Sequence, residues 1–110
     1  MRAHLLAIPV AAALLAPMSA QAQDATWLFS PGTPDYNTAA NWSPATVPTR
    51  TAFFDATIVS ALTIFGGTPA ATVGGWTFNS GAPAYSFAVG PGSLLFTGAG
   101  IVIKIGRAHV

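Results

Sequence analysis

The sequence predicts an all-β fold, the start of a β-helix or a related β-solenoid, in which short strands stack as successive coils. The stretch Thr57–Ile103 supports this prediction, because it contains no Asp, Glu, Lys, Arg, His or Cys. Within it, short β-prone runs alternate with turns rich in Gly, Pro, Asn and Ser. No window after residue 22 has a helical period of useful length, and the many Gly, Pro, Thr and Ser residues make a helix costly.

The alternative is a small antiparallel β-sandwich. A strand with its turn recurs about every ten residues and a pair of strands about every twenty, which suits solenoid coils, while sandwiches also space their strands by roughly 8–12 residues. A sandwich normally places Lys and Glu on its solvent faces, whereas the exposed positions here fall to Thr, Ser, Asn and Gly. Stacked coils set like residues above one another, where like charges would repel. The composition therefore favours the solenoid.

Residues 1–22 predict a secretory signal peptide. A short polar start is followed by the apolar stretch Leu5–Met18, which two prolines interrupt. Ala20 and Ala22 supply small residues at the −3 and −1 positions of a cleavage site after Ala22. A membrane-spanning helix is disfavoured, because a span needs roughly 20 apolar residues. We therefore expect the chain to be exported.

Residues 23–58 are expected to cap the N-terminal end of the solenoid. The chain there enters a β-prone run at Trp27, crosses a turn rich in Pro and Gly at Ser30–Asp35, and continues as a loop or single turn over Tyr36–Trp42. Thr51–Thr57 then reads as a strand. These elements would shield the first coil from water.

Residues 59–103 are expected to form the first, truncated coils. Their strands, most with a period of two, are predicted at Leu62–Phe65, Trp76–Phe78, Tyr85–Val89, Leu94–Phe96 and Ile101–Ile103. Glycine-containing turns separate these strands, and Gly98-Ala99-Gly100 is expected to divide the last two.

The C-terminal segment Lys104–Val110 differs from everything before it, because it places Lys, Arg and His together after a long uncharged stretch. It is similar to the in-frame translation of a common sequencing-library adapter. We expect residues 104–110 to be a non-native tail and exclude them from the fold prediction.

The formal charge of +1 is a property of the two ends. Without Arg2, Lys104 and Arg107, one arginine remains against three aspartates, a net charge of −2. No basic patch is left to bind phosphates, so no nucleic-acid partner is expected. The chain has no cysteine, which excludes a disulfide framework.

Catalysis has few candidate groups in the part of the sequence that we interpret as native. This part contains four charged residues and no His or Cys; the charged residues are Asp24, Asp35, Asp55 and Arg50. Asp35 is interpreted as a turn former and Asp55 as the partner of Arg50 in a solvated ion pair. No histidine can activate a serine, no phosphate-binding loop is present and no metal-ligand spacing occurs, so no enzyme activity, cofactor or metal is expected.

Four aromatic residues are the remaining candidates for a binding site: Trp27, Trp42, Trp76 and Tyr85. On a flat β face they would form a platform on which sugar rings stack. The favoured interpretation is that they cap and fill the start of the solenoid, where they shield apolar coils from water.

Several segments together resemble a known family: Ala25-Thr26-Trp27-Leu28, Asn41-Trp42, Val47-Pro48, Thr51-Ala52-Phe53, Gly75-Trp76-Thr77-Phe78 and Gly98-Ala99-Gly100-Ile101-Val102. The series is similar to the N-terminal passenger region of bacterial autotransporters that carry autotransporter-associated β-strand repeats. The resemblance implies a right-handed parallel β-helix, transit through the periplasm, and display at the outer membrane, the cell surface or outside the cell. It also implies a C-terminal β-barrel translocator as the partner and the only membrane contact.

Two function classes follow for this chain. The first is a structural or adhesive surface passenger with no catalytic activity of its own, whose partners would include host or cell-surface glycans. The second is a carbohydrate-binding or pectin-lyase-like module whose active residues lie downstream.

Overall fold

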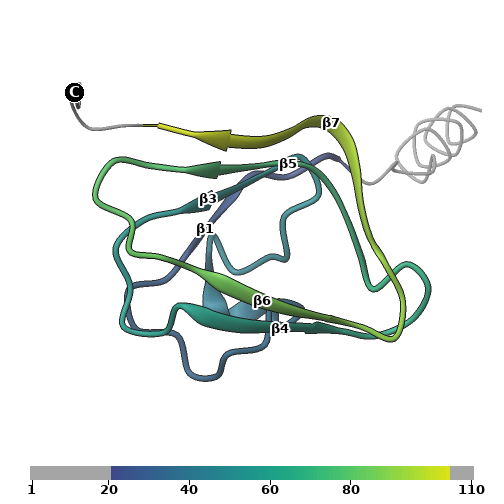
Figure 1. Cartoon of the computed structure of the whole chain (residues 1–110), viewed down its shortest axis with the longest axis horizontal. Helices are drawn as coiled ribbons and strands as arrows, with labels where there is room; N and C mark the ends of the chain where they lie inside the picture. The colour runs from purple at the N-terminus through teal and green to yellow at the C-terminus, as the bar shows by residue number, and fades with distance from the viewer. Residues whose placement is uncertain (1–20, 105–110) are drawn as a thin grey trace, which may run out of the picture.

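The computed structural model describes residues 21–104 (Figure 1). Ala20 of the predicted cleavage site and residues 105–110 of the predicted tail lie outside the described residues. The elements in chain order are β1 (Ala25–Trp27), the 3-10 helix η2 (Ala39–Asn41), β2 (Trp42–Ser43), β3 (Thr51–Phe54), β4 (Ala61–Phe65), β5 (Ala71–Phe78), β6 (Ser86–Gly90) and β7 (Leu94–Ile103).

The described strands form two sheets that face each other across the core (Figure 1). The first sheet has the order β2-β1-β3-β5-β7 and the second pairs β4 with β6. All ladders between successive coils are parallel, and together they make a β-solenoid of about three turns. The predicted all-β solenoid is confirmed. The antiparallel sandwich is wrong, because β1 and β2 are the only antiparallel pair among the described strands.

The coil length follows from the register of the first sheet. Ala25 pairs with Ala52, Ala52 with Trp76, and Trp76 with Ile101, so the three coils are 27, 24 and 25 residues long. This repeat exceeds the spacing of about twenty residues expected from the strand pairs. The observed coils are longer than expected because the turns between the two sheets add residues to each coil.

The second sheet starts within the predicted capping region. Asp35 forms a parallel bridge to Thr63. The Tyr36 amide donates to the Thr63 carbonyl at 2.9 Å, and the Thr63 amide donates to the Pro34 carbonyl at 2.9 Å. The first coil therefore already crosses between the two sheets, although its prolines and glycine predict only a turn.

The N-terminal end of the first sheet is covered. β2 pairs antiparallel with β1 and occupies its outer edge, with Thr26 opposite Ser43 and Trp27 opposite Trp42. Since Trp42 is buried, this short strand closes the core at that end as well as the sheet edge.

One strand, β7, runs through glycines for which the sequence predicts a separating turn. β7 is continuous from Leu94 to Ile103, so the division at Gly98-Ala99-Gly100 is wrong. The reason is close packing between coils, since a Cβ on Gly98 would lie 3.0 Å from the carbonyl oxygen of Gly74. These glycines let neighbouring backbones approach at a corner of the coil, where the β5–β7 register shifts between Val73 and Gly75.

Candidate functional site

The three candidate tryptophans lie inside the solenoid. Trp27, Trp42 and Trp76 are all buried. Trp27 Nε1 donates to the Val59 carbonyl at 2.9 Å. The three indoles therefore lack the exposed ring face that stacking on a sugar requires.

The buried rings form a continuous interior column. Trp42 lies edge-on to Trp27, with ring centroids 5.2 Å apart, and edge-on to Phe54 at 5.7 Å. Phe54 in turn meets Trp76 at 5.4 Å and stacks on Phe78 at 4.9 Å. Edge-to-face and offset contacts at these separations are favourable beyond the area that they bury. The column joins all three coils through aromatic contacts.

Tyr85 is placed at the margin of this column. Its ring is partly buried and stacks on Phe87, and its hydroxyl donates to the Asp55 carbonyl at 2.6 Å. Of the four candidates, Tyr85 alone keeps part of its ring in solvent.

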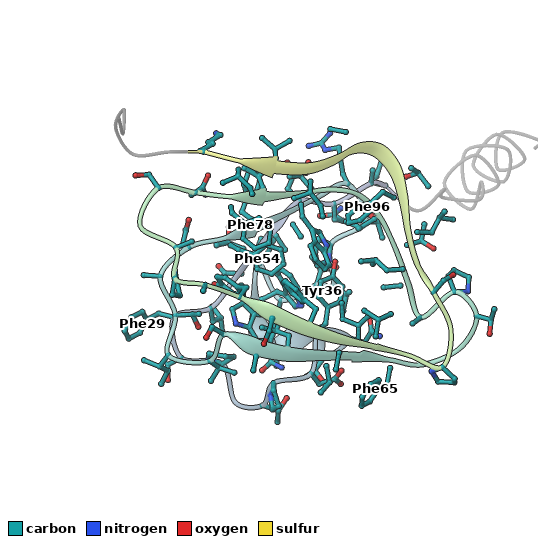
Figure 2. All side chains as sticks on the ribbon, viewed as in Figure 1. Phe29, Tyr36, Phe54, Phe65, Phe78 and Phe96 are labelled. Atoms are coloured by element: carbon teal, nitrogen blue, oxygen red, sulfur yellow. The ribbon has the colours of Figure 1, made fainter. Side chains whose placement is uncertain are left out.

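Tyr36 is a central residue, although the sequence around it predicts only a loop or a single turn. It is fully buried at the middle of the interior, between the two sheets (Figure 2). Its hydroxyl accepts from Trp76 Nε1 at 3.1 Å, and its carbonyl accepts from Trp42 Nε1 at 2.8 Å. The sequence offers one signal for the burial of Tyr36, an aromatic residue directly after the Pro- and Gly-rich turn Ser30–Asp35. No periodic pattern around Tyr36 predicts that it is buried.

The tyrosine pKa values give a testable pH dependence. Burial raises the pKa of Tyr36 to about 12 from 10.0, and burial followed by the Asp55 charge raises the pKa of Tyr85 as well. This stabilisation is complete below the unfolded pKa and is lost as the pH rises through the folded pKa. We expect the free energy of unfolding to fall from about pH 10 towards about pH 12.

Denaturant titrations at pH values across this range measure that loss, and tyrosinate absorbance locates the ionisation. Tyr36→Phe is the control, because it keeps the ring and removes one of the two hydroxyls. Its stability should fall less steeply with pH than that of the native chain. An unfolding free energy that is flat above pH 10 would contradict the burial of both hydroxyls.

Asn41 forms a second buried polar centre. Its Oδ1 accepts from the Gly32 amide at 3.0 Å and from the Thr33 amide at 3.4 Å. Its Nδ2 donates to Thr33 Oγ1 at 2.9 Å and to the Asp35 carbonyl at 2.8 Å. The side chain thus holds the proline-rich turn of the first coil against the core. Asn41-Trp42-Ser43 has the form of a glycosylation acceptor, but this buried amide is fully engaged in the folded chain.

We expect Asn41→Ala to cost about 2 to 3 kcal/mol of unfolding free energy, because it removes a buried side chain and the four hydrogen bonds that this side chain makes to the turn. Asn37→Ala is the comparison variant. Its amide bridges the Phe65 and Ala70 carbonyls at 3.0 Å each, one of them at an exposed position. Chemical denaturation should therefore show a smaller loss for Asn37→Ala; equal losses would mean that burial does not set the cost.

The charged residues are used in local structure. Arg50 pairs with Asp24, with Nε at 2.9 Å from Oδ1, and not with Asp55 as the sequence analysis expected. Parallel stacking explains the correction, because it sets each residue beside one a coil earlier. Asp55 instead accepts from Asn79 Nδ2 at 2.7 Å. Both groups of the Asp24–Arg50 pair are in solvent, and the hydrogen bond from Arg50 lowers the pKa of the Asp24 carboxyl.

Asp35 closes its own turn, as expected. Its Oδ1 accepts from the Asn37 amide at 3.0 Å and its Oδ2 accepts from Thr38 Oγ1 at 2.6 Å. The carboxylate is therefore a turn former.

The described residues, 21–104, offer no enclosed site for a small ligand. This part of the chain contains no pocket and no cluster of three or more His, Cys, Asp or Glu side chains that could hold a metal ion. Every buried polar side-chain atom there has a hydrogen-bond partner. Within the same residues no helix has the length and apolar character needed to cross a membrane.

The chain was compared with protein-family models, with curated proteins and with solved structures, and none of them matches it.

Proposed function

We propose that this chain is a structural or adhesive segment of an exported surface passenger, as its resemblance to autotransporter passengers implies. The observation that supports the proposal is the stack of parallel coils, 24 to 27 residues long, whose exposed side chains are mostly small and uncharged. A stack of this kind extends by adding coils and presents a long lateral surface. Such a surface is suited to contact with other cells or matrix.

The chemistry of the coils also suits folding after export. The strand ladders join successive coils, so the stack can form progressively. The chain has no cysteine, so no disulfide can trap it before translocation. The partner that the resemblance implies is a C-terminal β-barrel translocator, and the surface partners would include host or cell-surface glycans.

Localisation of the gene product in a Gram-negative cell tests the proposal. We expect mass spectrometry to find a mature N-terminus at Gln23 and protease added to intact cells to digest the coils. The double variant Ala20→Arg, Ala22→Arg is the control. It lacks the small residues of the predicted cleavage site and should therefore retain its N-terminal segment. Full-length protein that remains in the cytoplasm with Met1 intact would contradict export.

Adhesion is tested separately with beads coated with the purified chain. We expect the beads to bind cells or extracellular matrix, and beads coated with the heat-unfolded chain to bind less. Binding to one defined glycan on an array, without binding to cells, would favour the carbohydrate-binding module instead.

A further inference from the structure

The hydrogen-bond network of the described chain begins at the residue that follows the predicted cleavage site. Gln21 and Ala22 are exposed and lie outside any strand. The carbonyl of Gln23 accepts from the Thr49 amide at 3.0 Å and from the Arg50 amide at 2.8 Å. The amide of Gln23 donates to Thr49 Oγ1 at 2.9 Å. Since chain ends are poorly ordered unless they are tied down, cleavage after Ala22 would leave a first residue that the fold already holds.

The carboxylate beside this residue already has a cation. Asp24 Oδ1 accepts from Arg50 Nε at 2.9 Å and from the Thr51 amide at 3.1 Å, and Asp24 Oδ2 accepts from Arg50 Nη2 at 3.0 Å. An α-ammonium group at Gln23 would therefore compete with Arg50 for Asp24. A reaction that removes the charge of the new N-terminus breaks no ion pair of the described chain.

The side chain of Gln23 is available for such a reaction. Gln23 is exposed, and the hydrogen bonds that it forms within residues 21–104 all use its backbone atoms. Its carboxamide is therefore free to reach its own nitrogen. Two groups held within one residue react at a high effective concentration, so an N-terminal glutamine carries both partners of a ring closure.

We propose that Gln23 is a modification site, at which the mature chain closes its N-terminal glutamine into a lactam, pyroglutamate. This inference rests on the export proposed above, because cleavage after Ala22 frees the α-amine. The unprotonated α-nitrogen attacks the side-chain Cδ and forms a new C–N bond. The bond from Cδ to Nε2 breaks, and Nε2 leaves as ammonia with the proton that the α-nitrogen gives up. The step needs no oxidant, reductant or second reactant.

The fold accommodates the lactam. Ring closure leaves the Gln23 backbone carbonyl unchanged, so this carbonyl can still accept from the Thr49 and Arg50 amides. The lactam keeps one N–H and gains a ring carbonyl, and a threonine hydroxyl can accept from the first or donate to the second. Thr49 Oγ1 therefore has a partner before and after closure. A surface-displayed chain gains a neutral first residue that lacks the free α-amine on which aminopeptidases act.

Export of the full chain in a Gram-negative cell, followed by mass spectrometry of the freshly isolated protein, tests the modification. We expect a mature chain that begins at Gln23, is lighter by one ammonia and resists chemical N-terminal sequencing until pyroglutamyl aminopeptidase opens it. Gln23→Asn is the matched control, because it keeps the carboxamide but shortens the side chain by one methylene. Its closure would need a smaller, strained ring, so its α-amine should stay free. Circular dichroism should show the same β structure in both proteins.

The outcomes separate this proposal from the proposed export. A mature chain that begins at Gln23 with a free α-amine would overturn the lactam and leave export intact. Cleavage at another bond would overturn the lactam, since Gln23 would not be the first residue. A chain that keeps Met1 would overturn export and the lactam together. The loss of one ammonia from Gln23→Asn as well would place the reaction at another residue and overturn the assignment to Gln23.

Discussion

Phe54→Ala is expected to lower the unfolding free energy by about 3 to 5 kcal/mol, the cost of removing a fully buried phenylalanine. Phe54 is 0% exposed and lies at the centre of the aromatic column (Figure 2). Its ring has five aromatic neighbours: Trp42, Trp76, Phe78, Tyr85 and Phe87. Because these rings come from three successive coils, the cavity would loosen contacts between coils as well as within one.

Phe29→Ala is the matched control for this prediction. Phe29 is 61% exposed and points away from the core (Figure 2). Removal of its ring should change stability by under about 0.5 kcal/mol. Urea titration followed by tryptophan fluorescence measures both variants, since all three indoles are buried. Similar losses for the two variants would show that Phe54 does not lie in a packed core.

The solenoid class could be predicted from the sequence because the uncharged strands and their glycine-rich turns are local features. β4, β6 and the C-terminal half of β5 lie close to their expected positions for this reason. The coil length could not be predicted, because it is defined by which residues stack across coils. The wrong partner assigned to Arg50 has the same origin: its partner Asp24 is separated by about one coil and not by a few residues.

The sequence indicates which aromatic residues matter in the candidate site, but it does not indicate which residues they contact. The favoured interpretation of Trp27, Trp42 and Trp76 placed them as filling residues, and they lie in the interior. Tyr36 and Asn41 were missed because their burial depends on the proline-rich turn folding back onto the core. Turn residues predict a reversal of the chain, but they do not show which surface the reversal will contact.

Gly74→Ala is the second large effect, and it would arise from backbone contact. A Cβ at this position would overlap the Arg50 carbonyl oxygen and lie 3.2 Å from its carbonyl carbon. That oxygen already accepts the Gly75 amide at 2.9 Å, and the Gly74 amide donates to the Thr49 carbonyl at 3.0 Å. No side chain can rotate to make room, so neighbouring coils must separate at this corner.

We therefore expect Gly74→Ala to destabilise the chain by about 3 kcal/mol or more, at the upper end of the cost of overpacking. Gly32→Ala is the control, because the nearest atom to an added Cβ there is Asn41 Oδ1 at 3.9 Å, an ordinary contact. At both positions alanine reduces the conformational entropy of the unfolded chain by a similar amount. The difference in stability between the two variants therefore reports the backbone overlap at Gly74. Thermal and urea unfolding should thus show a neutral or slightly stabilised Gly32→Ala and a strongly destabilised Gly74→Ala. A Gly74→Ala variant as stable as the native chain would mean that adjacent coils do not approach closely at this corner, and the register of β3 with β5 would then be wrong.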